Sequence, residues 1–299
     1  MLTKSTLQYA VRASRPPPPL RLTPTKRFST RTPNKPVPSH LEVERKFNVT
    51  PHLMTTLQKH EQKQKNPSLH PSPEPHDIDL HFSRKPDAII NDAYFDCLDL
   101  LSTKGVWVRQ RTNLPLLDTQ LAIEDTAAGP SSTSTTEWQA KVLIGGDYTN
   151  SQFQEIVGEE EVKKIVDCYL SWNDLAQTVA LSTWRRSWTA QEHDDREAGK
   201  SMSEVLVVVD KVTSILSSRD AAGKPVTWEY TIGELEMTAG FELLGTDEGE
   251  ATKELLTARM SAQLEEWMKR HGQLFPAYPT PAGKLTAFYA WMKEAGMRG

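Results

Sequence analysis

The chain has 299 residues, of which 37% are hydrophobic and 25% are charged, a composition typical of a soluble globular protein with a sizeable core. No apolar run approaches the roughly 18 residues that a transmembrane helix needs, which argues against a helical membrane protein. Cys97 and Cys168 form neither a Cys-x-x-Cys pair nor a disulfide framework, so we expect two reduced thiols in an intracellular protein.

The formal net charge of −4 is unevenly distributed. Residues 1–41 contain eight Lys and Arg and no Asp or Glu, so the other residues carry 27 basic and 39 acidic side chains, a net charge of −12. General nucleic-acid binding requires a basic face, so this acidic body argues against a nucleic-acid partner. If the body binds a polyanion, its basic residues must gather in one concave place.

Residues 1–39 are predicted to be a disordered basic presequence outside the fold. The segment is rich in Arg, Ser and Pro and lacks acids, which is typical of mitochondrial transit peptides. The segment Arg27-Phe-Ser-Thr also resembles a processing-protease site. We therefore expect the protein in the mitochondrial matrix; the alternative is an ordinary basic tail on a cytoplasmic protein.

The rest of the chain, residues 40–297, is predicted to be a single α+β domain. Side-chain alternation predicts strands at Leu41–Phe47, Ala88–Cys97, Gly105–Thr112, Thr119–Glu124, Glu137–Leu143, Val179–Ala190, Glu204–Thr213 and Val226–Met237. Helical spacing predicts helices from Pro51 to about Gln64 and over Gln154–Leu170, Thr246–His271 and Gly283–Met297. Residues 65–77 and 126–136 are predicted loop insertions, and Ser214–Lys224 a turn. About eight strands with short turns favour an antiparallel sheet, and closing it removes exposed edges.

The first predicted strand places charges on one side. Successive side chains of a strand point to opposite faces, so Glu42, Glu44 and Lys46 share a face. Glu234 and Glu236 repeat the glutamate pair in the last predicted strand. Two carboxylates beside an ammonium suit a divalent cation next to an anion, because Mg²⁺ is commonly bound through carboxylates and substrate phosphates. For the first strand taken alone, the alternative is a solvated, charged edge strand.

Seven segments resemble a known family in their order and spacing. They are Leu-Glu-Val-Glu-Arg-Lys-Phe at 41–47, Asp-Ala-Tyr-Phe-Asp at 92–96, Trp-Val-Arg-Gln-Arg at 107–111, Glu-Trp-Gln-Ala-Lys at 137–141, Thr-Trp-Arg-Arg-Ser-Trp at 183–188, Gly-Glu-Leu-Glu at 233–236 and Pro-Ala-Gly-Lys-Leu at 281–285. With them, residues 40–297 resemble the CYTH superfamily, the triphosphate tunnel metalloenzymes, and within it the thiamine-triphosphatase branch.

The resemblance implies a closed antiparallel eight-stranded β-tunnel with flanking helices, whose charged lining clamps a triphosphate. It implies a metal site made of Glu42, Glu44, Glu234 and Glu236, with Asp210 as a further acid; Val208 occupies the alternative position for that acid. It implies phosphate contacts from Lys46, Arg109, Arg111, Lys141, Arg185 and Lys284, with Lys46 and Arg111 as catalytic residues. Arg185 and Arg186 face opposite ways, and the spacing to Trp188 favours Arg185 as the tunnel residue.

The expected activity is hydrolysis of thiamine triphosphate to thiamine diphosphate and phosphate, with Mg²⁺ as cofactor and Mn²⁺ as a substitute. One alternative is hydrolysis of inorganic triphosphate or a nucleoside triphosphate in the same tunnel. Another is a non-catalytic module that binds polyphosphate, although four glutamates would add little to such a module. We expect a small-molecule substrate, no nucleic-acid or membrane partner, and a monomer.

Deleting residues 1–38 should leave a folded, active protein and abolish mitochondrial import, because the acid-free head precedes the first predicted strand. Circular dichroism of the truncated protein and microscopy of tagged full-length and truncated chains would measure both effects. Loss of folding on truncation, or an unchanged cellular location, would contradict the presequence assignment.

Overall fold

The computed structural model describes residues 38–65, 80–115, 134–147, 150–192, 204–219, 225–242 and 247–296, which all belong to one compact unit, 36–299. Nearly all of the predicted presequence, most of the two predicted insertions and the whole of the predicted strand Thr119–Glu124 lie outside the described residues.

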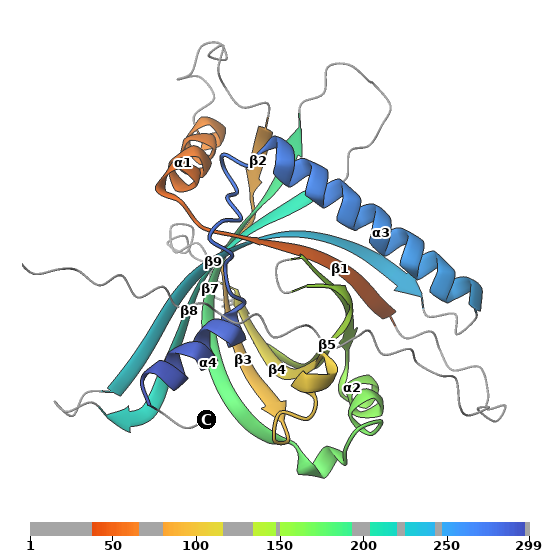
Figure 1. Cartoon of the computed structure of the whole chain (residues 1–299). Helices are drawn as coiled ribbons and strands as arrows, with labels where there is room; N and C mark the ends of the chain where they lie inside the picture. Colours follow the sequence, from red (N-terminus) through yellow and green to blue (C-terminus); the bar gives the residue numbers. More distant parts are fainter. Residues whose placement is uncertain are drawn as a thin grey trace, which may run out of the picture. The chain divides into compact units, whose positions relative to one another are not determined.

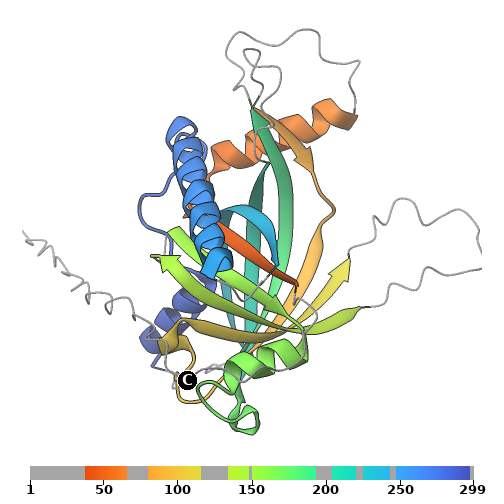
Figure 2. The same ribbon diagram turned by 90° about the vertical axis from the view of Figure 1, so that its right-hand side faces the viewer.

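The described strands form one antiparallel sheet that closes on itself (Figures 1 and 2). They are β1 (Pro38–Phe47), β2 (Leu80–Arg84), β3 (Ala88–Asp96), β4 (Val106–Pro115), β5 (Thr135–Gly146), β6 (Asn150–Val157), β7 (Ala176–Glu192), β8 (Val205–Arg219) and β9 (Pro225–Glu242). The order β7-β3-β4-β5-β6-β1-β9-β8 returns to β7, because β8 also pairs with β7. The predicted closed eight-stranded antiparallel barrel is therefore confirmed, and β2 is an additional strand on the far end of β7.

Within the described residues, four α-helices accompany the barrel: α1 (Pro51–Lys65), α2 (Glu159–Val166), α3 (Asp247–Arg270) and α4 (Lys284–Glu294). Short 3-10 turns lie at Ser102–Lys104 and Trp172–Asp174. Among the described helices, none is both long and apolar enough to cross a membrane. In Figure 1, α3 runs alongside β1 and β9, and α4 lies beside the other end of β9.

Strict alternation along β1 separates a hydrophobic face from a charged one. Val43 and Phe47 are fully buried in the main hydrophobic cluster, where they join Leu53 of α1 and Leu264 of α3. Burying an apolar side chain of this size stabilises a fold by about 1.5–3 kcal/mol relative to exposure. The outer face of β1 is thus held by α1 and α3, and the even-numbered side chains must point into the barrel.

The apolar face of α4 closes one end of the barrel. Phe288 and Met292 of this helix pack against Leu181 of β7, Val212 of β8 and Trp228 of β9, and all five side chains are buried. Aromatic contacts add to the packing, since the Trp228 and Phe288 rings meet edge to face with centroids 5.3 Å apart.

One predicted helix, Gln154–Leu170, is wrong over its first part. Residues 150–157 form β6, which pairs with β1 on one side and β5 on the other, and only Glu159–Val166 is helical. Pairing on both edges overrides the weak helical spacing. Gly158 separates the two elements with a φ of 110°, a conformation that side-chain-bearing residues rarely adopt.

Two smaller differences concern strand ends. The predicted turn at Ser214–Lys224 is too long, because β8 continues to Arg219 and pairs there with Pro225. The short strand β2 was not predicted; its five residues follow a Pro-rich stretch and gain their order by pairing with β7.

The contact between Gly233 and Phe47 yields a test of the packing. The Phe47 ring lies over Gly233 so closely that an added Cβ would sit 2.1 Å from a ring carbon, whereas a Cβ on Gly240 of the same strand would meet nothing within 4 Å. We expect Gly233→Ala to lower the free energy of unfolding by about 1–3 kcal/mol, as overpacked cores do. Gly240→Ala is the matched control and should leave stability nearly unchanged. Urea denaturation measures both, and equal effects would contradict this packing.

Candidate active site

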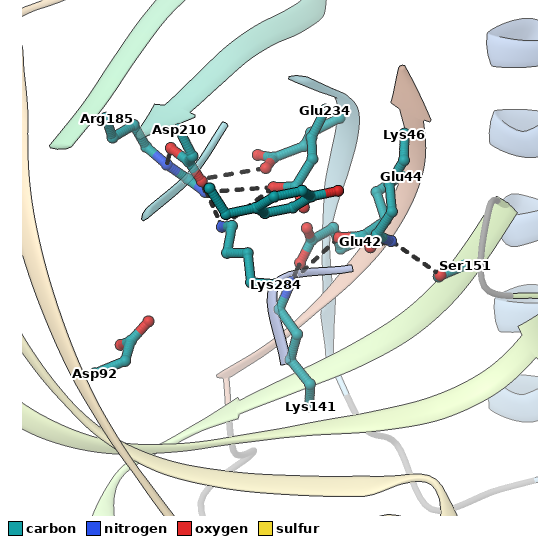
Figure 3. A network of polar contacts seen from close by, with 12 residues as sticks. Glu42, Glu44, Lys46, Asp92, Lys141, Ser151, Arg185, Asp210, Glu234 and Lys284 are labelled. Atoms are coloured by element: carbon teal, nitrogen blue, oxygen red, sulfur yellow. Dashed lines mark hydrogen bonds and ion pairs between the residues drawn. The ribbon is translucent and has the colours of Figure 1, made fainter. Parts of the chain in front are cut away.

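The charged side chains predicted for the site come together inside the barrel (Figure 3). All of the predicted site residues take part in ion pairs with one another or with neighbouring interior acids. The acids are Glu42, Glu44, Asp210, Glu234 and Glu236, and the basic residues are Lys46, Arg109, Arg111, Lys141, Arg185 and Lys284. Most are buried, and removing charges from water is costly unless they are paired. The barrel interior is therefore a network of mutually neutralising charges.

Lys141 of β5 is at the centre of the first group. Its Nζ lies 2.7 Å from Glu42 and 3.5 Å from both Glu44 and Glu155. It also sits 5.0 Å from the centroid of the Phe153 ring, a cation–π arrangement. Burial alone would lower the pKa of Lys141, but these carboxylates hold that pKa well above its ordinary value. Lys141 is thus a permanent cation.

Lys46 extends the same group. Its Nζ donates to the Glu44 carboxylate and, at 3.4 Å, to the Ser151 hydroxyl of β6. Burial by itself would raise the pKa of Glu44, but Lys141 and Lys46 lower it to about 2. Glu44 is therefore ionised throughout the physiological range.

Arg185 of β7 organises the second group. Its guanidinium donates two hydrogen bonds to Asp210, at 2.9 and 2.7 Å, in the bidentate geometry typical of strong Arg–carboxylate pairs. The same group lies 3.5 Å from Glu234 and 3.6 Å from Glu236. Asp210 is completely buried and faces the interior, as does Arg185, whereas the neighbouring Arg186 lies on the outer side beside Met54.

Lys284 is the first residue of α4, and its side chain enters the same interior. Its Nζ pairs with Asp210 and lies 3.4 Å from Glu234. Two hydrogen bonds hold the segment that precedes Lys284. Asn48, directly after β1, donates to the Pro279 carbonyl at 2.6 Å, and the Tyr230 hydroxyl of β9 donates to the Ala282 carbonyl at 2.9 Å. These bonds place Lys284 against acids that lie far away in the sequence.

Arg109 and Arg111 of β4 form a third group around Asp92 of β3. Arg111 donates two hydrogen bonds to Asp92, at 2.7 and 2.8 Å, and Arg109 lies 3.9 Å from the same carboxylate. Arg109 also donates to Gln139 at 2.9 Å and to Glu155 at 3.2 Å, which joins this group to the one around Lys141.

Asp92 and Glu155 are interior acids that the sequence analysis did not assign to the site. Asp92 was within reach of prediction, because it begins the segment Asp-Ala-Tyr-Phe-Asp at 92–96 that forms part of the family resemblance. The structure places it directly opposite Arg111. Glu155 was missed for a specific reason: the segment was expected to be helical, but it is a strand in which Glu155 faces Lys141.

Two glutamates carry an excess of negative potential. Burial raises the pKa of Glu42, Lys141 opposes this, and Glu155, Glu236 and Glu44 raise it further, to a net value well above the ordinary one. Burial likewise raises the pKa of Glu236, Arg185 opposes this, and Glu234 adds to the rise. Carboxylates crowded in this way attract a cation, and oxygen donors are those that Mg²⁺ prefers. The chemistry of the donors thus fits a divalent ion, although in the described ranges no three carboxylate, His or Cys side chains are already grouped around a metal position.

The comparisons with known proteins give distant structural likenesses only. No family model and no curated protein matches the chain. Among solved structures, a protein from Pyrococcus horikoshii OT3 is 12% identical, with 76% of this chain and 88% of that chain covered and a TM-score of 0.36. An adenylyl cyclase candidate from Hippeastrum, described as having a dominant triphosphatase activity, is 13% identical over 88% of this chain and 97% of that chain, with a TM-score of 0.34. An adenylate cyclase candidate from Vibrio parahaemolyticus is 10% identical over 75% and 88% of the two chains, with a TM-score of 0.29.

The hydrogen-bonded ion pair between Asp92 and Arg111 should make a pH-dependent contribution to the free energy of unfolding. Burial would raise the pKa of Asp92, but Arg111 and Arg109 lower it to about 2 from the ordinary 3.8, a difference worth roughly 2–3 kcal/mol. Because the folded pKa is the lower one, the ionised carboxylate stabilises the fold above about pH 4, and this contribution is lost as the pH falls toward 2.

Asp92→Asn should therefore destabilise the protein by about 2–3 kcal/mol at pH 7, and its deficit relative to the wild type should shrink as the pH falls from 4 toward 2. Asp167→Asn, at an exposed i,i+4 pair with Lys163, is the control and should have little effect at any pH. Denaturant unfolding at a series of pH values measures both. A deficit that does not vary with pH would show that the carboxylate charge of Asp92 contributes nothing.

Proposed function

We propose that the protein is a metal-dependent hydrolase that cleaves the terminal phosphoric anhydride of a triphosphate bound inside the barrel. The observation that carries the proposal is the interior itself: three groups of buried or partly buried Arg and Lys side chains, each held in place by carboxylates. An apolar ligand could not replace any partner in these ion pairs, whereas a polyanion with a divalent cation supplies both signs.

The basic side chains are proposed to bind the phosphates. Arg109, Arg111 and Arg185 offer planar forks that match phosphate oxygens, and Lys46 and Lys141 offer point charges. Each already binds a carboxylate, so phosphate binding exchanges one anionic partner for another and leaves no cation unpaired. Such groups are preorganised, which is what stabilises charge that develops on phosphoryl oxygens during transfer.

Glu42, Glu44, Glu234 and Glu236 are proposed to hold Mg²⁺, or Mn²⁺ in its place. When bound, the ion would neutralise phosphate charge and polarise the bond that is cleaved. The supporting observation is the position of the four carboxylates on neighbouring strands, where Glu44 lies directly opposite Glu236. Burial and this crowding raise the pKa of Glu42 and of Glu236, and a cation would relieve the crowding. Asp210 is better suited to placing Arg185 and Lys284, because both cations bind its carboxylate.

Lys46 and Arg111 are proposed as the residues that act on the reacting phosphoryl group. Arg111 is held in a fixed orientation by Asp92, so its fork can stabilise the transition state without first reorganising. Lys46 reaches the interior beside Glu44, where an ammonium can contact the same phosphoryl group that a metal on Glu44 would contact.

Thiamine triphosphate is the proposed substrate, with thiamine diphosphate and phosphate as products. This finer assignment is supported by the sequence motifs that resemble the thiamine-triphosphatase branch. Inorganic triphosphate and nucleoside triphosphates are the competing substrates for the same groups, and a polyphosphate-binding module without catalysis is the competing function. Phosphate release from each compound, with and without Mg²⁺, separates these alternatives.

Two variants should separate the metal role from the phosphate role. Glu44→Gln removes one negative charge from the proposed metal site and should lower turnover in a way that raised Mg²⁺ partly restores. Arg111→Ala removes a phosphate fork and should lower kcat/KM by roughly 100-fold or more, without rescue by Mg²⁺. Initial rates measured across an Mg²⁺ titration report both.

Glu265→Gln is the control for charge removal, because Glu265 is largely exposed on α3 and pairs with Arg45 outside the barrel. It should leave rates unchanged. Identical Mg²⁺ responses of the Glu44 and Arg111 variants would contradict the division of roles. Full activity of both variants would contradict the placement of the active site in the barrel interior.

A further inference from the structure

Residues 276–283, called the connector below, lead from the hydrophobic core to Lys284. The start of the connector is fixed by packing: the ring of Phe275 lies 5.0 Å from that of Phe47 and 4.9 Å from that of Trp267. The next part is different, because residues 277–280 are exposed and belong to no helix or strand. The path of the connector toward Lys284 is therefore not set by burial of its side chains.

The start of α4 is poorly held by the helix itself. Lys284 is its first residue, and Gly283 at the N-cap offers no side chain that could cap the helix. A cation at this end is also opposed by the positive end of the helix dipole. The buried anchors Phe288 and Met292 lie one and two turns further on, and helix ends fray. Something other than α4 must keep Lys284 in place.

Asn48 is the first hydrogen-bonded anchor of the connector. It follows β1 directly and lies two residues after Lys46. Its backbone N–H donates to the Pro276 carbonyl at 2.9 Å, and its side-chain amide donates to the carbonyls of Pro276 at 3.3 Å and of Pro279 at 2.6 Å. One residue thus binds the connector at two points to the strand that carries Lys46.

Tyr230 of β9 is the second anchor. Its ring is stacked on Trp228, with centroids 5.6 Å apart, and its hydroxyl donates to the Ala282 carbonyl at 2.9 Å. Burial raises the pKa of Tyr230, so the hydroxyl keeps the proton that it donates. Only Gly283 stands between this bond and Lys284, which makes Tyr230 the anchor nearest to the lysine.

The two anchors lie on the same two strands as the charges that they serve. Lys46 of β1 is paired with Glu234 of β9, and Nζ of Lys284 lies 3.4 Å from Glu234 (Figure 3). The connector passes close to Lys46, because a Cβ on Gly283 would lie 3.4 Å from Cε of Lys46. Lys284 thus reaches the carboxylate that lies opposite Lys46 through a segment bound to both strands.

We propose that Tyr230 and Asn48 are positioning residues, which hold Lys284 in the interior by fixing the connector. The hydroxyl of Tyr230 and the amide of Asn48 end on connector carbonyls, so both act through Lys284. The kinetic consequence of this inference rests on the proposed function, in which Lys284 contacts the phosphates. The effect on the position of Lys284 does not rest on it.

The first test is chemical labelling, which requires no activity. The side chain of Lys284 is largely buried and paired with two acids, so an amine-acetylating reagent should modify it slowly. Tyr230→Phe removes only the hydroxyl, and Asn48→Asp keeps the size of the side chain but removes its donor. Each should raise the acetylation rate of Lys284 about 3-fold or more, because one hydrogen bond that holds the closed position is lost. Mass spectrometry measures the rate.

Two controls belong to the labelling test. Lys293 is exposed in the last turn of α4 and should be acetylated equally fast in all proteins. Tyr278→Phe removes a hydroxyl from an 88% exposed side chain of the connector itself and should leave the labelling of Lys284 unchanged.

The second test is a double-mutant cycle, measured on whichever of thiamine triphosphate, inorganic triphosphate and ATP the wild type hydrolyses fastest. Tyr230→Phe should lower kcat/KM about 3- to 10-fold, the factor expected for one net hydrogen bond. In the background of Lys284→Ala the same change should have no further effect, because the residue that it positions is gone. A purely structural role of Tyr230 would lower kcat/KM equally in both backgrounds.

The outcomes separate this inference from the proposed function. Faster labelling of Lys284 in both variants, with a kinetic loss that Lys284→Ala abolishes, supports the inference. Faster labelling in a protein that releases phosphate from no triphosphate supports the positioning of Lys284 and overturns the proposed function. Unchanged labelling in both variants, or an equal kinetic loss with and without Lys284, overturns the inference and leaves the proposed function standing.

Discussion

The whole structure depends on pairing opposite charges inside a closed strand barrel. A buried ion without a partner costs several kcal/mol, so an Arg or Lys can point inward only where an acid faces it. The register provides these partners directly: Asp92 lies opposite Arg111, and Asp210 lies opposite Arg185. An interior built in this way is stable when empty, and it offers a polyanion cations that are already oriented.

The outer packing enforces this arrangement. Shifting β1 by one residue relative to β9 would move Glu42, Glu44 and Lys46 to the outer face and Val43 and Phe47 inward. The burial of Val43 and Phe47 against α1 and α3 opposes such a shift, and the Phe47 ring fits only because residue 233 is glycine. The interior charges are therefore positioned by hydrophobic contacts on the other side of the same strands.

The two ends of the barrel differ in the elements that border them. One end is occupied by the apolar face of α4, and the segment leading into that helix delivers Lys284 to Asp210 and Glu234. At the other end, β9 runs past its last pair with β8, at Glu236, and continues along β1 to Glu242. Lys284 therefore reaches the interior acids from the end that α4 fills.

By itself, the sequence determined the inward direction of most site residues, because strand alternation is local and each charged residue keeps its parity whatever its partner. The closed antiparallel barrel was expected from the resemblance of the seven segments, and the strand pairing confirms it. It did not determine the partners. The strand β6 carries a weak helical pattern, and only its pairing with β1 and β5 makes it a strand and brings Glu155 to Lys141. Likewise, Lys284 meets Asp210 through contacts across more than seventy residues. Such partners follow from register and packing between distant segments, which no local pattern encodes.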